Sequence, residues 1–118
     1  MLAGFGLGTV AVQGLHAQAK APVYTVTEVE ILDADAYAKD FAPRARAAAQ
    51  AAGSKVLALG GKTTTLDGDP PKSRIIIQQW DSIEQIKAFR DSAAYQELLP
   101  IRDKLSKFRT YAVEGIAP

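Results

Sequence analysis

Cysteine is absent from the 118-residue sequence, and histidine occurs once, as His16. The lack of cysteine excludes disulfides, thiolate nucleophiles and cysteine-ligated zinc or iron–sulfur sites. His16 lies in an N-terminal segment that we expect to be removed, so a mature chain would also lack histidine. A Ser-His-Asp triad or a histidine-ligated transition metal would then be impossible. We therefore expect no metal and no cofactor, which leaves carboxylates, Tyr, Lys and Arg for proton transfer.

Charge of one sign is also lacking. Lys and Arg number 14 against 13 Asp and Glu, so the formal net charge is +1, and the basic residues form no run. Nucleic-acid binding needs a clustered basic surface, and we expect no nucleic-acid partner. The length and the ordinary balance of hydrophobic and charged residues are those of one globular domain.

Residues 1–19 contain no charged side chain and end in Ala17-Gln18-Ala19. An apolar run that closes on a small-x-small pattern predicts a signal peptide, here cut before Lys20, although no Lys or Arg precedes the run. Residues 20–118 would then form a single periplasmic or secreted domain without stable membrane insertion. The alternative is that the segment is retained as an N-terminal anchor.

Four segments rich in branched and aromatic residues predict strands. They are Pro22–Leu32, Ser54–Leu59, Arg74–Trp80 and Phe108–Gly115. The first alternates, which indicates one better-buried face. The third contains three consecutive isoleucines, which predicts a central strand covered on both faces. Gly60-Gly61 after the second strand indicates a bulge or a close backbone approach.

Two helical regions separate these strands. The first begins after Asp33, a predicted helix cap, and ends at Gly53. Pro43 predicts a kink or break near Phe41. The apolar stripe of this region consists of Tyr37, Phe41, Ala45, Ala48 and Ala52.

The second helical region follows Asp81-Ser82. Either residue can cap its helix, and Ser82-x-x-Gln85 fits a capping box. Ser92 is predicted to cap a further turn, and Pro100 to stand in the first turn of a last helical piece. The resulting order, β-α-β-β-α-β, is that of an α+β ferredoxin-like fold with an antiparallel four-stranded sheet. Helices on one face leave the other face bare, so we expect a two-fold symmetric homodimer.

Several motifs resemble the dimeric α/β-barrel family named domain of unknown function 1330, over about residues 22–116. They are Asp33 with Tyr37 and Phe41, Gly53, Gly60-Gly61, Leu66-Asp67-Gly68, Arg74-Ile75-Ile76-Ile77, Ser92-x-x-Tyr95-Gln96, Arg102 and Glu114-Gly115. Three positions depart from the family pattern: Ala52 where the family has Gly, Phe89 where Trp is common, and Trp80 where Phe is preferred. The resemblance implies the dimeric barrel fold and adds little about activity.

Seven residues are candidates for a binding site. Arg74 and Arg102 could together clamp an anion, or each could pair with a carboxylate of its own chain, such as Asp33, Asp67 or Glu114. Tyr37, Tyr95, Trp80 and Phe89 could line a small-molecule cavity, or simply pack in the core. Asp33 could be a general base, although capping already accounts for it.

Three functions remain open from the sequence. The chain could bind a small anionic or aromatic molecule without catalysis. It could be a cofactor-independent enzyme, similar to monooxygenases or isomerases of the dimeric barrel type, in which arginines hold the substrate and a Tyr or Asp moves a proton. It could also be a structural dimer without a ligand.

Overall fold

The computed structural model describes residues 20–118. The predicted signal peptide, residues 1–19, lies outside the described residues. Four strands are present: β1 (Val23–Ile31), β2 (Lys55–Leu59), β3 (Arg74–Trp80) and β4 (Ser106–Glu114). Their helical connections are α2 (Ala34–Ala36), the π-helical turn η1 (Tyr37–Phe41), α3 (Ala42–Ala51), α4 (Ile83–Asp91), α5 (Ala93–Gln96) and α6 (Leu99–Leu105). The predicted order β-α-β-β-α-β is confirmed.

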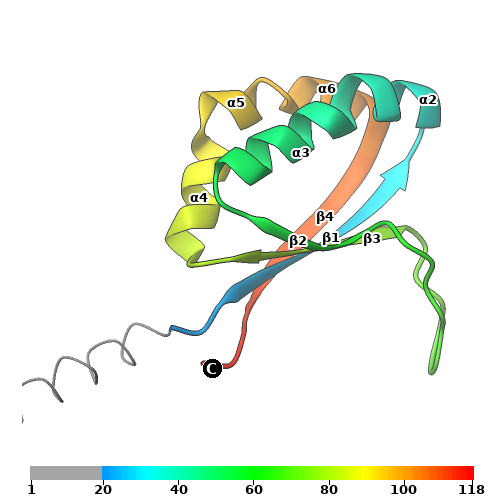
Figure 1. Ribbon diagram of the computed structural model, residues 1–118. Coiled ribbons are helices and arrows are strands. Elements are labelled where there is room, and N and C mark those ends of the chain that lie inside the picture. Colours follow the sequence, from blue (N-terminus) through cyan, green and yellow to red (C-terminus); the bar gives the residue numbers. More distant parts are fainter. Residues whose placement is uncertain (1–19) are drawn as a thin grey trace, which may run out of the picture.

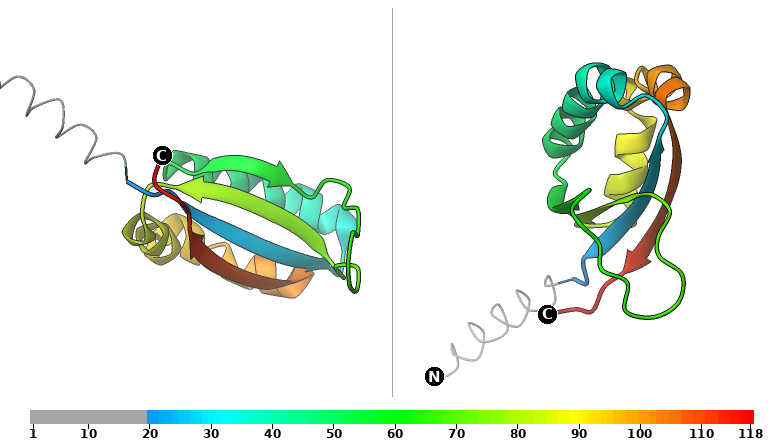
Figure 2. Two further views of the ribbon diagram at one scale, coloured as in Figure 1. Left: turned by 90° about the horizontal axis from the view of Figure 1, so that it is seen from below. Right: turned by 90° about the vertical axis from the view of Figure 1, so that its right-hand side faces the viewer.

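The strands form one antiparallel sheet in the order β2-β3-β1-β4. All the helices lie on one face of this sheet (Figure 1). Figure 2 shows the opposite face without any covering element. The predicted α+β ferredoxin-like architecture with an antiparallel four-stranded sheet is therefore confirmed.

The two faces of the sheet differ in burial. In β1 the side chains of Val23, Thr25, Thr27 and Val29 are buried under the helices, and the intervening residues from Tyr24 to Glu28 are half-buried on the bare face. β3 lies between β2 and β1, as its three isoleucines predicted. However, these isoleucines are only half-buried. Ile75 and Ile77 lie on the bare face, and Ile76 lies on the covered face, where it lines a cavity.

The first helical region begins and ends at the predicted residues. The Asp33 carboxylate accepts a hydrogen bond from the backbone N–H of Ala36 at 3.1 Å. The π-helical turn η1 ends at Phe41, and Pro43 stands in the first turn of α3, where a missing N–H leaves no helical bond unmade. Gly53 follows the helix with a φ of 98°, which favours glycine.

The second helical region has its predicted caps. The Ser82 hydroxyl accepts from the backbone N–H of Gln85 at 3.1 Å, and the Ser92 hydroxyl accepts from that of Tyr95 at 3.3 Å. The Gln85 side chain also donates to the carbonyl of Ala52 at 3.0 Å, which fixes α4 against the end of α3. Pro100 lies in the first turn of α6. The strand that follows begins at Ser106, two residues before the predicted start.

The core consists of two clusters of buried side chains. One contains Val29, Tyr37, Phe41, Leu98 and Leu105, and the other contains Val23, Trp80 and Ile86. Burial of such side chains contributes about 1.5–3 kcal/mol each to folding. Members of both clusters also line a cavity between the sheet and the helices.

Candidate functional site

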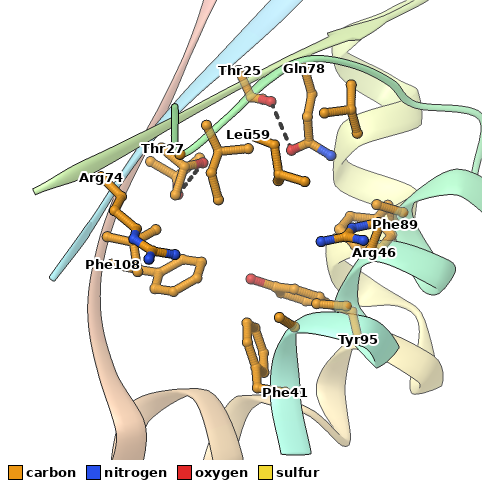
Figure 3. A pocket seen from close by; sticks show the side chains of 18 of the residues that line it. Thr25, Thr27, Phe41, Arg46, Leu59, Arg74, Gln78, Phe89, Tyr95 and Phe108 are labelled. Carbon is orange, nitrogen blue, oxygen red and sulfur yellow. Dashed lines mark hydrogen bonds between the residues drawn. The ribbon is translucent and has the colours of Figure 1, made fainter. Parts of the chain in front are cut away.

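A cavity of about 220 Å³ lies on the helix-covered face of the sheet (Figure 3). Its sheet side consists of Thr25, Thr27, Val29, Val56, Leu59, Gly60, Arg74, Ile76, Gln78, Trp80, Phe108 and Thr110. Its helix side consists of Tyr37, Phe41, Ala42, Ala45, Arg46, Ala49, Ile86, Phe89, Arg90 and Tyr95. The cavity is smaller than the pockets that bind drug-sized molecules, so it suits a small ligand.

Aromatic rings form much of the apolar wall. The ring of Phe89 lies 5.3 Å from that of Trp80 and 4.7 Å from that of Tyr95, between ring centroids. On another part of the wall, Phe41 lies 5.3 Å from Tyr37 and meets Phe108 edge-on at 5.7 Å. These separations are those of favourable aromatic pairs. The predicted Tyr37, Tyr95, Trp80 and Phe89 all lie on the cavity wall. Tyr37, Tyr95 and Trp80 are also buried, whereas Phe89 is half-buried.

Three arginines line the cavity: Arg46 on α3, Arg74 at the start of β3 and Arg90 on α4. Figure 3 shows Arg46 and Arg74 on opposite sides, with their guanidinium groups directed inward. The lining contains no Asp, Glu or Lys. Within residues 20–118, none of the three arginines forms an ion pair. The cavity is therefore positively charged without a compensating carboxylate.

Gly60 lies beside Arg74 in a backbone conformation that favours glycine. Gly60 has a φ of 67° and donates its N–H to the carbonyl of Ile75 at 2.9 Å. A Cβ atom at this position would lie 3.4 Å from Cδ of Arg74, which is an ordinary contact distance. The Gly pair predicted a bulge or a close approach. The structure instead shows a positive φ at Gly60, and an irregularity of register earlier in the strand, between Val56 and Ala58.

A directed chain of hydrogen bonds crosses the sheet side of the cavity. The indole N–H of Trp80 donates to the Thr25 hydroxyl at 3.0 Å, and that hydroxyl donates to Oε1 of Gln78 at 3.5 Å. Nε2 of Gln78 donates to the Ser54 hydroxyl at 3.2 Å. Because indole nitrogen only donates, Thr25 must be the acceptor in the first bond of this chain.

A second polar pair lies beside this chain. The hydroxyls of Thr27 and Thr110 share one hydrogen bond of 3.1 Å between β1 and β4. Two hydroxyls carry two hydrogens and this bond uses one, so one hydrogen remains for another acceptor. Figure 3 shows Thr27 on the sheet side of the cavity, near Arg74.

Arg102 does not join Arg74 at the cavity. Its guanidinium donates to the Tyr95 hydroxyl at 2.8 Å and to the carboxylate of Asp103 at 2.9 Å. It also lies over the ring of Phe108, 5.0 Å from the centroid. The expected clamp of Arg74 with Arg102 is therefore not formed, because α6 holds Arg102 behind two wall residues. Its carboxylate partner is its sequence neighbour rather than Asp33, Asp67 or Glu114.

Asp33 is exposed and lies outside the cavity lining, where it caps α2. Tyr37 is buried, and this burial raises the pKa of its phenol above the ordinary value of 10.0. The positive charge of Arg74 opposes the rise in pKa, and the neighbouring Tyr95 adds to it. Tyr37 is thus a neutral phenol at neutral pH, able to donate or accept a hydrogen bond.

Arg46 was missed because the π-helical turn shifts the face of α3 that looks inward. Both stripes include Ala45, but the predicted stripe continued through Ala48 and Ala52, whereas the observed one continues through Ala49. The residues of α3 on the wall are spaced as i, i+3, i+4 and i+7 from Ala42, and Arg46 is the i+4 member. Pro43 is the signal that could have identified Arg46, because a one-residue shift of the helical spacing there places Arg46 on the inward stripe.

The same part of the chain was searched for other kinds of site. Among residues 20–118, no group of three or more His, Asp or Glu side chains is placed to hold a metal ion. Nor does any helix between these residues have the length and apolar character needed to cross a membrane.

Three solved structures share the fold. The protein of unknown function RPA0582 from Rhodopseudomonas palustris is 17% identical, with a TM-score of 0.62 over 92% of this chain and 94% of that one. Its methylated form gives a TM-score of 0.67, at 17% identity and coverage of 90% and 93%. A conserved Bacteroides thetaiotaomicron protein, described as a possible oxidoreductase, is 12% identical, with a TM-score of 0.53 over 80% and 98%. At these identities the likeness concerns the fold alone.

The sequence matches no curated protein. It does match a family over residues 22–116, which includes all four strands and all the helices described above. The match covers the motifs that suggested the resemblance, from Asp33 to Glu114-Gly115. The chain therefore belongs to the family described as domain of unknown function, DUF1330.

Proposed function

We propose that this protein binds a small anion with an apolar body in the cavity between the sheet and the helices. The observation that carries the proposal is the set of Arg46, Arg74 and Arg90 around an aromatic cavity without a lining carboxylate. All three are exposed residues, so water solvates their guanidinium groups when no ligand is bound, and they are free to pair with an anion. A bound carboxylate or phosphate would supply that partner through paired hydrogen bonds.

Binding without catalysis agrees better with the wall than proton abstraction does. A general base should have a pKa near the working pH, and no carboxylate lines the cavity. Burial raises the pKa of Tyr37, which makes this phenol a poorer base at neutral pH. The cofactor-independent enzyme of the sequence analysis is therefore the second candidate. Its support is that Tyr37 and Tyr95 both face the cavity as hydrogen-bonding groups.

Calorimetric titration with phenylbutanoate and phenylbutylamine tests the proposal. These two compounds share an apolar body and differ in the sign of the charge. We expect phenylbutanoate to bind and phenylbutylamine not to bind. Arg74→Gln and Arg46→Gln should each weaken phenylbutanoate binding about ten- to a hundred-fold, the cost of one charge-assisted contact.

Arg44→Gln is the matched control, because Arg44 lies on the same helix as Arg46 and outside the cavity lining. It should leave the affinity unchanged. Equal binding of the amine and the carboxylate, or equal losses in all three arginine variants, would contradict an anion site.

We further propose that two copies of the chain pair through the bare face of the sheet. This face carries Tyr24, Val26, Ile75, Ile77, Tyr111 and Val113. Tyr111 and Val113 remain 44% and 50% exposed, on the same face as the other four, which are half-buried. A second copy supplies the same apolar surface in a two-fold arrangement. Light scattering at micromolar concentration should give twice the mass of the chain, and a monomer would refute the pairing.

Finally, we propose that residues 1–19 direct export and are cut before Lys20, which would place the domain in the periplasm or outside the cell. The support is the uncharged apolar run and its Ala17-Gln18-Ala19 ending. Cleavage there would leave the domain whole, because β1 begins at Val23. Intact-mass measurement on protein from the native host should give a chain that starts at Lys20. A mass that includes residues 1–19 would instead favour the N-terminal anchor.

A further inference from the structure

The Tyr95 hydroxyl has a fixed hydrogen-bond direction. Tyr95 is 6% exposed, lies on α5 and lines the cavity. Its oxygen is 2.8 Å from Nη1 of Arg102. A guanidinium has donors only, so Arg102 donates and Tyr95 accepts. The hydrogen of the Tyr95 hydroxyl is therefore left over, and it meets no acceptor within residues 20–118.

Arg102 is held in place by two contacts besides the one with Tyr95. Its Nε and Nη2 atoms lie 2.9 and 2.8 Å from Oδ1 of Asp103, and its guanidinium covers the ring of Phe108. The side chain is 16% exposed. A guanidinium fixed in this way keeps its third contact, with Tyr95, at a defined place. Arg102 thus orients the Tyr95 hydroxyl rather than touching a ligand.

Gln78 presents a second donor. Its Oε1 atom accepts a hydrogen bond from Thr25. Nε2 of Gln78 carries two hydrogens and donates one to Ser54. The other hydrogen is unused within the described residues. Tyr95 and Gln78, which both line the cavity, thus each have one hydrogen left for an acceptor.

We infer that the ligand is an oxo acid, which is an anion with an apolar body and a carbonyl oxygen as a second acceptor. The carbonyl oxygen accepts the hydrogen bond of the Tyr95 hydroxyl, and Arg102 is the positioning residue. This inference depends on the proposed anion binding and specifies the class of ligand. A carbonyl oxygen accepts one or two hydrogen bonds and donates none. It can therefore accept from the Tyr95 hydroxyl, and it needs no carboxylate acceptor on the wall.

Calorimetric titration with benzoylpropanoate and phenylbutanoate tests this inference. The two carboxylates have the same skeleton, and the first has a carbonyl where the second has a methylene. Tyr95→Phe should weaken binding of benzoylpropanoate about three- to ten-fold, the value of one neutral hydrogen bond. Binding of phenylbutanoate should stay within about two-fold, because the aromatic ring of residue 95 is kept.

Arg102→Met should reduce the preference for benzoylpropanoate in the same way, because methionine cannot donate to the Tyr95 oxygen. Arg102→Lys should restore it in part, since an ammonium group can donate there. A residue that mattered only for packing would change the affinities of the two carboxylates equally. If Arg102→Met does not fold, as judged by circular dichroism, Tyr95→Phe and Arg102→Lys still decide the question.

The outcomes separate this inference from the proposed function. If both carboxylates bind and Tyr95→Phe weakens them equally or not at all, the oxo acid is wrong and the anion site stands. If neither carboxylate binds to the unmodified protein, both proposals are refuted. If benzoylpropanoate alone loses affinity in Tyr95→Phe, while Arg74→Gln weakens both compounds, both proposals are supported.

Discussion

The two faces of the sheet each carry some residues that are unexpected for their exposure. The face under the helices includes Thr25, Thr27, Gln78 and Thr110 beside apolar core residues, whereas the bare face includes Val26 and Ile77 beside the ion pair of Glu28 and Arg109. A face that is covered only for folding would normally be apolar, and a face left to water would normally be polar. The polar residues of the covered face border the cavity, and the apolar residues of the bare face support the pairing proposed above.

The hydrogen bonds on the two faces support this comparison. On the covered face, the polar side chains are joined by bonds such as those from Trp80 to Thr25 and from Gln78 to Ser54. No buried side-chain nitrogen or oxygen is left without a partner within residues 20–118. On the bare face, the ion pair of Arg109 and Glu28 lies at 2.9 Å beside the apolar residues. The polar side chains of the covered face are thus hydrogen-bonded to one another beside the cavity, whereas Arg109 and Glu28 pair on the bare face.

The largest effect should come from a charge on the bare face. Ile77 lies opposite Val26 of β1 and Ala58 of β2, near the middle of that face. Ile77→Glu would bury an unpaired carboxylate between the two copies of the proposed dimer, so we expect that dimer to weaken more than about 100-fold. Light scattering should then give the mass of one chain, and circular dichroism should show that it is folded. Arg44→Glu, on the helical side, is the control and should leave the dimer intact. A dimer that survives Ile77→Glu would show that the partner lies elsewhere.

A smaller effect is expected where the chain shapes the wall of the covered face. Gly60→Ala places a Cβ against Arg74 at a φ of 67°, so it should destabilise the fold by about 1–2 kcal/mol. Phenylbutanoate binding should change by less than about two-fold, because the new Cβ would be in ordinary contact with Arg74. Gly61→Ala is a close control, because a Cβ there meets nothing within 4 Å. Urea unfolding and titration of both variants measure the two effects. Equal stabilities would mean that the positive φ of Gly60 imposes no requirement for glycine.

The sequence predicted the framework well, because the signals for it are local. Asp33, Ser82 and Ser92 cap the helices that they were expected to cap, and the isoleucines of β3 mark an interior strand. A cap depends on a few adjacent residues, so its pattern is visible in the sequence.

The composition of the site could be predicted only in part. Arg74 and Tyr95 lie on the cavity wall as expected. Arg46 was missed because the π-helical turn rotates α3, and Arg102 was misplaced because the docking of α6 decides which side of Tyr95 it reaches. Both depend on packing between elements distant in the sequence. Thr27 was read only as part of a strand, because its role depends on Thr110, 83 residues away.

The next prediction, of a smaller effect, tests whether the hydrogen bond between Thr27 and Thr110 stabilises the fold. Thr27→Val alone leaves the Thr110 hydroxyl without its partner, so it should cost about 1 kcal/mol of unfolding free energy. Replacing both threonines by valine removes donor and acceptor together and should bring the cost back to within about 0.5 kcal/mol of zero. Urea unfolding of the two single variants and the double variant completes the cycle. A double variant that loses the sum of both single costs would show that the two hydroxyls are not coupled.

The smallest effect concerns the charge state of the buried phenol. Burial raises the pKa of Tyr37 in the folded chain, whereas the unfolded chain ionises near 10.0. As the pH rises above 10.0, the unfolded state loses this proton first, so the free energy of unfolding falls until the folded pKa is also passed. Tyr37→Phe removes this contribution, and its stability should decline less steeply over the same pH range. Urea unfolding as a function of pH measures both slopes. Tyr111→Phe, on the bare face, controls for the loss of a tyrosine hydroxyl as such. If the free energies of unfolding of Tyr37→Phe and of the unmodified protein decline in parallel above pH 10.0, burial does not raise the pKa of this phenol.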